Sequence, residues 1–273
     1  MFNLITWNIQ SARDSLLDDI VATLHGMGQF DALCLQEVAS DADGDQFAAL
    51  AERLPGYHAV SALALDALDD DGGRRRLGSM IFSRHPVLQV FRHSLPWPAD
   101  PAVMGIPRVA LEATLDTPLG LLGVSSVHLE YFSLTQRLAQ VERLRELRAE
   151  AHAQAHCARP GQAVNGPFRA VPRAAAAIVA GDFNLLPGSA EHARLLARVD
   201  DATAPLRDAW QLAFPERPHG PTVGLHDTSP GAGAPFTFDY IFVSEQLAGR
   251  VQRLRVDQGR HGSAHQPMML SLA

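Results

Sequence analysis

The stretch AAIVAGDFNLLPGS, residues 176–189, joins a short apolar run to a polar corner. A run of this length that ends at glycine and proline is typical of a buried strand. Asp182 and Asn184 follow the run directly, so a carboxylate and an amide are expected where this strand ends. Other strands with the same polar ending would gather such side chains at one edge of a sheet.

Apolar runs with strand character alternate with helical patterns along the whole chain. Helices are expected at 14–28, 44–54 and 134–151, the last with an apolar stripe of Leu134, Leu138, Val141, Leu144, Leu147 and Ala151. Strands are expected at 2–9, 31–38, 57–63, 77–83, 87–94, 108–115, 119–129, 238–244, 250–257 and 267–272. Those between 57 and 129 are interpreted as an antiparallel meander with turns at His85-Pro86 and Thr117-Pro118.

The remaining segments are predicted to be less regular. Residues 157–173 are rich in proline, glycine and arginine, which indicates a surface loop, and residues 200–236 predict a short helix with a long loop. We find no linker of the kind that separates domains. The pattern predicts a single α/β domain over residues 1–273, with helices outside two packed layers of sheet.

Polar side chains recur at the ends of the apolar runs. They are Asn8, Gln36, Glu37, His128, Asp182, Asn184, Asp239 and His265. Each alone has an ordinary explanation, such as a turn residue, a helix cap or a hydrogen-bonded core histidine. Because strand ends on one side of a sheet converge, the set predicts carboxylates, amides and histidines in one place.

This collection of side chains suits phosphoryl chemistry. Glu37, with Asn8 nearby, offers hard oxygen ligands for Mg²⁺ or Mn²⁺. An aspartate can orient or deprotonate an attacking water, while an asparagine and a histidine donate to phosphoryl oxygens. Asp239 could hold His265 in one tautomer. Zinc and serine chemistry are weaker alternatives, because the chain has no HExxH and no GxSxG motif.

The composition of the chain limits which substrates and binding partners are expected. The formal net charge is −7, and all 23 basic residues are arginine, which disfavours a broad nucleic-acid groove. No apolar run could cross a bilayer, and no signal peptide is recognised, so a cytoplasmic protein without a membrane partner is expected. The predicted substrate is a phosphate ester, either a small molecule or a nucleic-acid end, and no obligate protein partner is evident.

Ordered motifs across almost the whole chain carry a family resemblance. They are TWNI (6–9), LQEV (35–38), GSMIFSRHPV (78–87), PRVALEA (107–113), SSVHLEYFSLTQRLAQ (125–140), GDFNLLPGS (181–189), FDYIFVS (238–244) and SAHQP (263–267). With these motifs the chain resembles the endonuclease/exonuclease/phosphatase family, which includes deoxyribonucleases and neutral sphingomyelinases. The resemblance implies a four-layer α/β/β/α sandwich of two mixed sheets, and a phosphoesterase that uses Mg²⁺ or Mn²⁺.

The resemblance also implies roles for matching residues. Glu37 is the expected main metal ligand with Asn8 in support, and His128 is expected to contact phosphate. Asp182 is expected to align or activate water, and Asn184 to donate in the transition state. Asp239 is the expected partner of the catalytic His265. Arg108 either faces the substrate or forms a plain surface salt bridge.

One position departs from the family pattern. The family reads Ser-Asp-His where this chain has Ser263-Ala264-His265. The resemblance implies that this aspartate contributes to the metal or its bound water, and losing such a carboxylate lowers metal affinity or activity about 10–100-fold. The alternative function is therefore a catalytically weakened member that binds a phosphorylated ligand.

Overall fold

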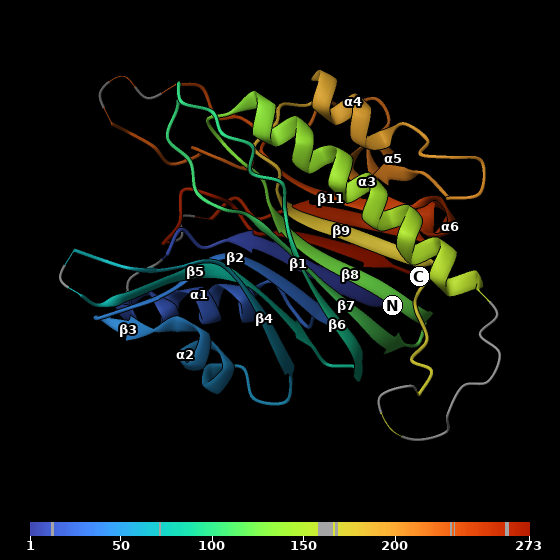
Figure 1. Ribbon diagram of the computed structural model, residues 1–273, viewed down its shortest axis with the longest axis horizontal. Helices are drawn as coiled ribbons and strands as arrows, with labels where there is room; N and C mark the ends of the chain where they lie inside the picture. The colour runs from blue at the N-terminus through green and yellow to red at the C-terminus, as the bar shows by residue number, and fades with distance from the viewer. Residues whose placement is uncertain are drawn as a thin grey trace.

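The computed structural model describes residues 1–11, 14–70, 72–157, 166, 169–229, 231, 233–259 and 262–273. Most of the predicted surface loop at 157–173 lies outside these residues. Two mixed sheets form the centre of the molecule (Figure 1). This architecture confirms the predicted α/β sandwich.

The first sheet has the strand order β12-β13-β1-β2-β5-β4, with β3 paired to β2. The bounds are β12 (Val251–Val256), β13 (Met268–Leu272), β1 (Phe2–Asn8), β2 (Ala32–Asp41), β5 (Arg74–Ser83), β4 (His58–Leu68) and β3 (Gly44–Asp45). Strands β1 and β2 are parallel, and the other pairs in this sheet are antiparallel.

The second sheet has the order β10-β11-β9-β8-β7-β6. The bounds are β10 (Leu206–Asp208), β11 (Asp239–Ser244), β9 (Ala176–Asp182), β8 (Gly120–His128), β7 (Val109–Thr117) and β6 (Val87–Ser94). Strands β8 and β9 are parallel, and the other pairs are antiparallel.

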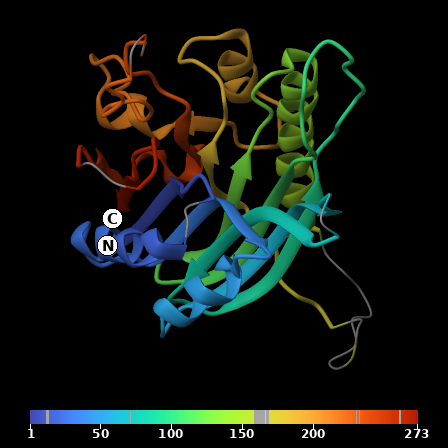
Figure 2. The same cartoon turned by 90° about the vertical axis from the view of Figure 1, so that its left-hand side faces the viewer.

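Three apolar clusters define four layers. The inner faces of both sheets share one cluster, which includes Leu4, Leu111 and Ile241. Helices α1 (Asp14–Gly26) and α2 (Gln46–Arg53) pack on the outer face of the first sheet, and α3 (Leu134–His156) and α4 (Ala190–Leu196) cover the second. Figure 2 shows these two pairs of helices on opposite sides of the sheets. Two short helices, α5 (Ala209–Ala213) and α6 (Glu245–Ala248), flank β10 and β11.

The predicted meander is wrong in one respect. Strands β4 and β5 belong to the first sheet, whereas β6, β7 and β8 belong to the second. The chain therefore crosses between sheets at His85-Pro86 instead of making a hairpin turn there. The turn at Thr117-Pro118 is confirmed, because Thr117 pairs with Gly120. Alternation of apolar residues marks each strand but does not say in which sheet it lies.

The predicted apolar stripe of helix α3 is only partly buried. Val141, Leu144, Leu147 and Ala151 are buried as the stripe predicts, but Leu134 is 51% exposed and Leu138 is 37% exposed. The first turns of the helix leave these two leucines largely uncovered. Helix α4 was not predicted, because seven residues are too few to show a helical period. Among the described residues, no helix combines the length and apolar character needed to cross a bilayer.

Candidate active site

The polar ends of strands from both sheets meet at one edge of the sandwich. Strand register sets the neighbours: Asn8 lies beside Gln36, and Asp182 lies between His128 and Asp239. The structure brings together all seven residues that were predicted to meet in one place and given chemical roles: Asn8, Glu37, His128, Asp182, Asn184, Asp239 and His265.

Asp182 occupies the centre of this cluster because Gly181 lets β9 come close to β8. Gly181 has φ +144°, and a Cβ atom there would lie 2.0 Å from the carbonyl oxygen of Val127. A side chain would thus push the strands apart. The glycine of the GDFN motif is required by this contact, which sets Asp182 at the strand end.

Asn8 joins the two central carboxylates. Its Nδ2 donates to Glu37 Oε1 at 2.9 Å and to Asp182 Oδ2 at 3.0 Å. Its Oδ1 accepts from the backbone N–H of Gln10 at 2.9 Å, so the amide nitrogen faces the carboxylates. A role of Asn8 as an oxygen ligand, as predicted, would require the amide to turn.

Glu37 reaches the cluster from a strained position. Its φ is +54°, in the left-handed region, and the register of β2 against β5 shifts between Gln36 and Val38. Strand β2 continues to Asp41, so Glu37 lies at a bulge within the strand and not at its predicted end. A bulge of this kind re-aims a side chain, and such strain is concentrated at functional sites. The carboxylate of Glu37 is 26% exposed and lines a cavity.

His265 and Asp239 form a buried pair. The imidazole Nδ1 lies 2.8 Å from Asp239 Oδ2, and Thr222 Oγ1 donates to the same oxygen at 2.7 Å. Trp7 Nε1 donates to the carbonyl oxygen of His265 at 2.9 Å, which fixes the backbone. Burial opposes a charged ring, but the carboxylates of Asp239, Asp182 and Glu37 prevail and raise the pKa of His265 to about 9.

Asp182 is also perturbed. Burial, followed by the negative charge of Asp239, raises the pKa of Asp182 to about 7 against the lowering effects of His265 and Asn8. The Nε2 atoms of two histidines flank Asp182 Oδ2, at 3.6 Å for His128 and 3.8 Å for His265. Asp182 is therefore a carboxylate poised to exchange a proton near neutral pH.

Arg108 is buried, so it does not form the surface salt bridge that was one of its two predicted roles. It is 8% exposed, and its Nε lies 3.2 Å from Oε2 of the fully buried Glu130. Its Nη1 lies 3.1 Å and 2.9 Å from the ring nitrogens of His128. Burial and the positive charges of Arg108 and His265 hold the pKa of His128 well below its usual value, so this ring is neutral.

Asn184 completes the edge with a left-handed backbone, φ +51°. Its backbone N–H donates to Asp182 Oδ1 at 3.0 Å, and its Nδ2 donates to the carbonyl oxygen of Leu129 at 2.8 Å. Asn184 is 5% exposed and lines the cavity. These bonds hold the amide in a fixed place beside Asp182.

The side chains surround a cavity of about 490 Å³. Its polar lining comprises Gln10, Glu37, Arg108, His128, Asp182, Asn184 and His265. This volume is in the range of small-molecule sites. Sequence reasoning missed Gln10, Thr222 and Glu130, because only the folded chain brings these positions to the site.

Ala264, the departure from the family pattern, is exposed beside this site. Its backbone N–H donates to Gln10 Oε1 at 2.7 Å, and its carbonyl oxygen accepts from Gly224 N–H at 3.1 Å. The backbone is thus fixed on both sides, and an exposed position can accept a larger side chain.

The donor set fits a hard divalent cation. Glu37 and Asp182 share one amide donor, and Asp239 Oδ1 is buried without a hydrogen-bond partner among the described residues. The charged His265 supplies one positive charge against these three carboxylates, so the cluster still attracts a cation. Carboxylate oxygens are the ligands that Mg²⁺ and Mn²⁺ prefer. Glu37 is the most exposed of the three, because its side chain is 26% exposed against 2% for Asp182 and 1% for Asp239.

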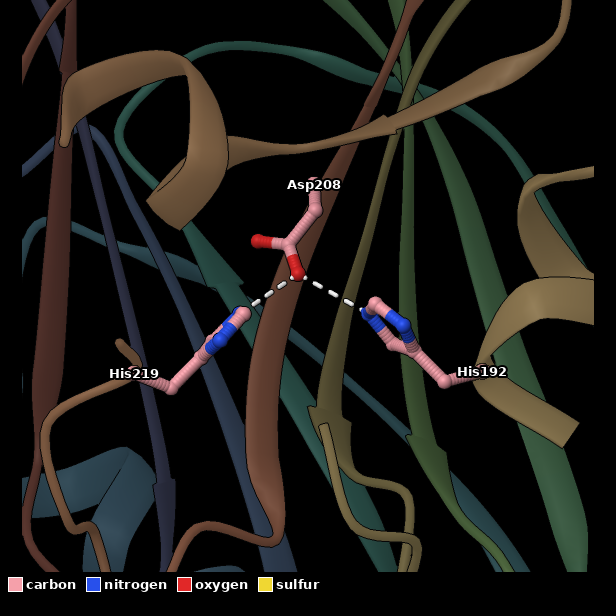
Figure 3. Close-up of side chains that lie close together, drawn as sticks. All are labelled: His192, Asp208 and His219. Atoms are coloured by element: carbon pink, nitrogen blue, oxygen red, sulfur yellow. Dashed lines mark hydrogen bonds and ion pairs between the residues drawn. The ribbon is translucent and has the colours of Figure 1, made fainter. Parts of the chain in front are cut away.

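A second group of side chains has metal-compatible chemistry but a different character. His192 Nε2 and His219 Nε2 lie 2.9 Å and 2.7 Å from Asp208 Oδ2 (Figure 3). Gly188 N–H points at His192 Nδ1 from 3.4 Å, which places the ring proton on Nε2, the atom facing Asp208. We interpret the group as a hydrogen-bonded cluster that ties α4 and the loop at His219 to β10.

The four-layer sandwich is the fold of a family of hydrolases that act on phosphoesters. The sequence pattern of the Endonuclease/Exonuclease/phosphatase family matches residues 5–265, and the chain belongs to this family. Members of the family include nucleases and phosphatases. No curated protein sequence matches the chain.

Solved structures share the fold. An endonuclease/exonuclease/phosphatase from Beutenbergia cavernae DSM 12333 is 24% identical, with a TM-score of 0.68 over 99% of this chain and 71% of its own. A mannosyl-6-phosphatase from Bacteroides thetaiotaomicron VPI-5482 is 18% identical with a TM-score of 0.68, and both chains are covered completely. The 3′ phosphatase NExo from Neisseria, bound to a product DNA hairpin, is 20% identical with a TM-score of 0.68 and the same coverage.

Proposed function

We propose that this protein is a divalent-metal-dependent phosphoesterase that hydrolyses a phosphodiester or phosphomonoester with Mg²⁺ or Mn²⁺. The observation that supports it most is the convergence of Asp182 with the His265–Asp239 pair on a single cavity. A carboxylate with a pKa of about 7 suits water activation, and a buried imidazolium suits the stabilisation of negative charge.

Each side chain has a defined task in this proposal. Asp182 orients the attacking water and takes up its proton. His265, protonated at neutral pH and held by Asp239, donates from Nε2 to a phosphoryl oxygen. Asn184 uses one amide hydrogen for the carbonyl oxygen of Leu129, which leaves the second for the transition state.

The remaining side chains bind the phosphoryl group and the cation. Neutral His128 contacts a phosphoryl oxygen, and Arg108 holds this ring in place through the contact with its nitrogens. Glu37, with Asn8 beside it, would hold the cation. When bound, the cation neutralises charge that grows on the phosphoryl group.

The chemistry of two structural neighbours supports a small substrate or a nucleic-acid end. One neighbour is a mannosyl-6-phosphatase and the other is a 3′ phosphatase bound to a DNA hairpin. The net charge of −7 disfavours a long duplex, because duplex binding relies on neutralising many phosphates. A panel of sugar phosphates, nucleotides, short DNA ends and duplex plasmid, each assayed with Mg²⁺ and with Mn²⁺, tests this. Rapid nicking of plasmid at physiological salt would contradict it.

One observation favours a second candidate function. Ala264 places no carboxylate where the family has one, so a weakened member that binds a phosphorylated ligand is the alternative. Tight binding of a phosphate ligand without turnover in either metal would support this alternative over hydrolysis.

A further inference from the structure

The cavity has a polar floor and an aromatic side. We call this side the aromatic wall; it consists of Tyr131, Phe132, Phe236 and Phe238. Tyr131 is 50% exposed, Phe132 is 49% exposed and Phe236 is 37% exposed. A cluster of solvent-exposed aromatic side chains beside a polar site indicates a binding surface.

The rings of the wall form one connected group. Ring centroids lie 4.7 Å apart for Tyr131 and Phe132, 5.9 Å for Tyr131 and Phe238, and 4.6 Å for Phe236 and Phe238. All three pairs have the edge-to-face arrangement that aromatic rings prefer. A neighbouring hollow of about 400 Å³ also includes Tyr131, Phe132 and Phe238, so the wall borders open space on two sides.

Buried polar groups fix the backbone under the wall. Oε1 of the fully buried Glu130 accepts from the backbone N–H of Phe132 at 2.8 Å. Arg137 Nη1 donates to the carbonyl oxygens of Glu130 and Tyr131 at 3.0 Å and 2.9 Å. On the other side, Phe236 and Val223 exchange two backbone hydrogen bonds. The exposed rings therefore stand on a preorganised support, which lowers the entropic cost of binding.

The same support connects the wall to the phosphoryl site. Glu130 holds Phe132 through Oε1 and Arg108 through Oε2, and Arg108 contacts His128. Arg108 is the one arginine among the described residues that line the cavity, and Glu130 already balances its charge. In the described part of the chain, the four residues of the wall thus offer no cation for a second phosphate, whereas they offer several ring faces and edges.

We propose that the aromatic wall binds a flat aromatic ring carried by the phosphate ester while the phosphoryl group lies at Asp182 and His265. The inference rests on the proposed function and names the class of substrate for that site. A ring can extend the edge-to-face group already present, which a flexible alkyl chain cannot do.

Binding of non-hydrolysable phosphonates tests the inference without depending on turnover. Phenylphosphonate, cyclohexylphosphonate and methylphosphonate are titrated calorimetrically into the whole protein in excess Mg²⁺. We expect phenylphosphonate to bind about 10-fold or more tighter than methylphosphonate, and several-fold tighter than cyclohexylphosphonate.

Substitutions in the aromatic wall test whether its rings cause the tighter binding of phenylphosphonate. Tyr131→Ala and Phe132→Ala are each expected to weaken phenylphosphonate about 5- to 50-fold and to leave methylphosphonate unchanged. Leu134→Ala is the matched control, because Leu134 is 51% exposed on the adjoining turn and does not line the cavity. It should bind all three ligands as the wild type does.

The outcomes separate this inference from the proposed function. Equal affinity for phenyl- and methylphosphonate would overturn the ring site and leave the phosphoryl site standing. Equal affinity for phenyl- and cyclohexylphosphonate would overturn the preference for an aromatic ring. Failure of all three to bind would overturn both.

Discussion

His265 and Asp239 pair across the two sheets: Asp239 begins β11 of the second sheet, and His265 lies just before β13 of the first. Their 2.8 Å contact, buried on both sides, holds the imidazole charged against the cost of burial. The pair therefore depends on the packing of the whole sandwich.

Removing the charge of Asp239 should change both rate and pH dependence. Asp239→Asn is expected to lower kcat about 100-fold or more, because His265 loses the partner that keeps it protonated. His265 acts in its charged form below its raised pKa, so wild-type kcat/KM should fall as pH rises through about 9. In Asp239→Asn this fall should begin at lower pH. A pH profile from 6 to 10 with an unmoved upper limb would contradict the assigned pairing.

Glu37 is the residue to change for metal dependence. Glu37→Gln keeps the shape but removes the charge, so the Mg²⁺ concentration for half-maximal activity should rise about 10-fold or more. Glu52→Gln, an exposed carboxylate on α2, is the control. Titration of activity with Mg²⁺ after EDTA treatment measures both. If the two variants respond alike, Glu37 is not the principal ligand.

Restoring an aspartate at position 264 should strengthen metal binding. Position 264 is exposed and its backbone is held by Gln10 and Gly224, so an aspartate adds charge without being buried. Ala264→Asp is expected to lower the metal concentration needed for half-maximal activity about 10-fold or more. Unchanged activity and metal affinity in this variant would mean that the alanine is harmless.

The cluster at Asp208 should matter for stability. Burial acts to raise the pKa of Asp208, but hydrogen bonds from His192, His219 and the backbone N–H of Trp210 prevail and hold it below its usual value. Asp208→Ala is expected to lower the free energy of unfolding at pH 7 by about 3 kcal/mol, because two buried rings and a helix N-terminus lose their acceptor.

The pH dependence of this loss has a definite sign. A depressed carboxyl pKa stabilises the fold above the unfolded pKa of about 4 and loses that contribution as pH falls through the folded pKa. Urea unfolding at pH 7 and near pH 3 should therefore show a smaller difference between variant and wild type at acid pH. A Tm that rises with Zn²⁺ and loses this rise in His219→Ala would contradict our hydrogen-bonded interpretation.

Much of this architecture is readable from the sequence, because each buried strand has an apolar run and most site residues stand at or just beyond the end of one. Glu37 is the exception, since β2 continues past it to Asp41. The Asp239–His265 pairing and the meeting of Glu37 with Asp182 follow the expectation. The chain's crossing at His85-Pro86 is not readable, since periodicity carries no information on which sheet a strand joins.

Other features depend on contacts that form only in the folded chain. Arg108 is buried against Glu130, which is 22 positions away, and Thr222 contacts Asp239, which is 17 positions away. The bulge at Glu37 appears in the chain only as one altered dihedral angle. No local pattern marks them. The aromatic wall likewise combines residues near 131 with residues near 237, from two segments without a shared motif.

Hydrolysis of bis-p-nitrophenyl phosphate tests the central proposal most directly. The account predicts turnover with Mn²⁺ or Mg²⁺ that EDTA abolishes, and a loss of about 100-fold or more in His265→Ala with the fold retained by circular dichroism. Turnover that persists in His265→Ala, or a wild-type protein that binds phosphate ligands and hydrolyses no phosphate ester in either metal, would contradict it.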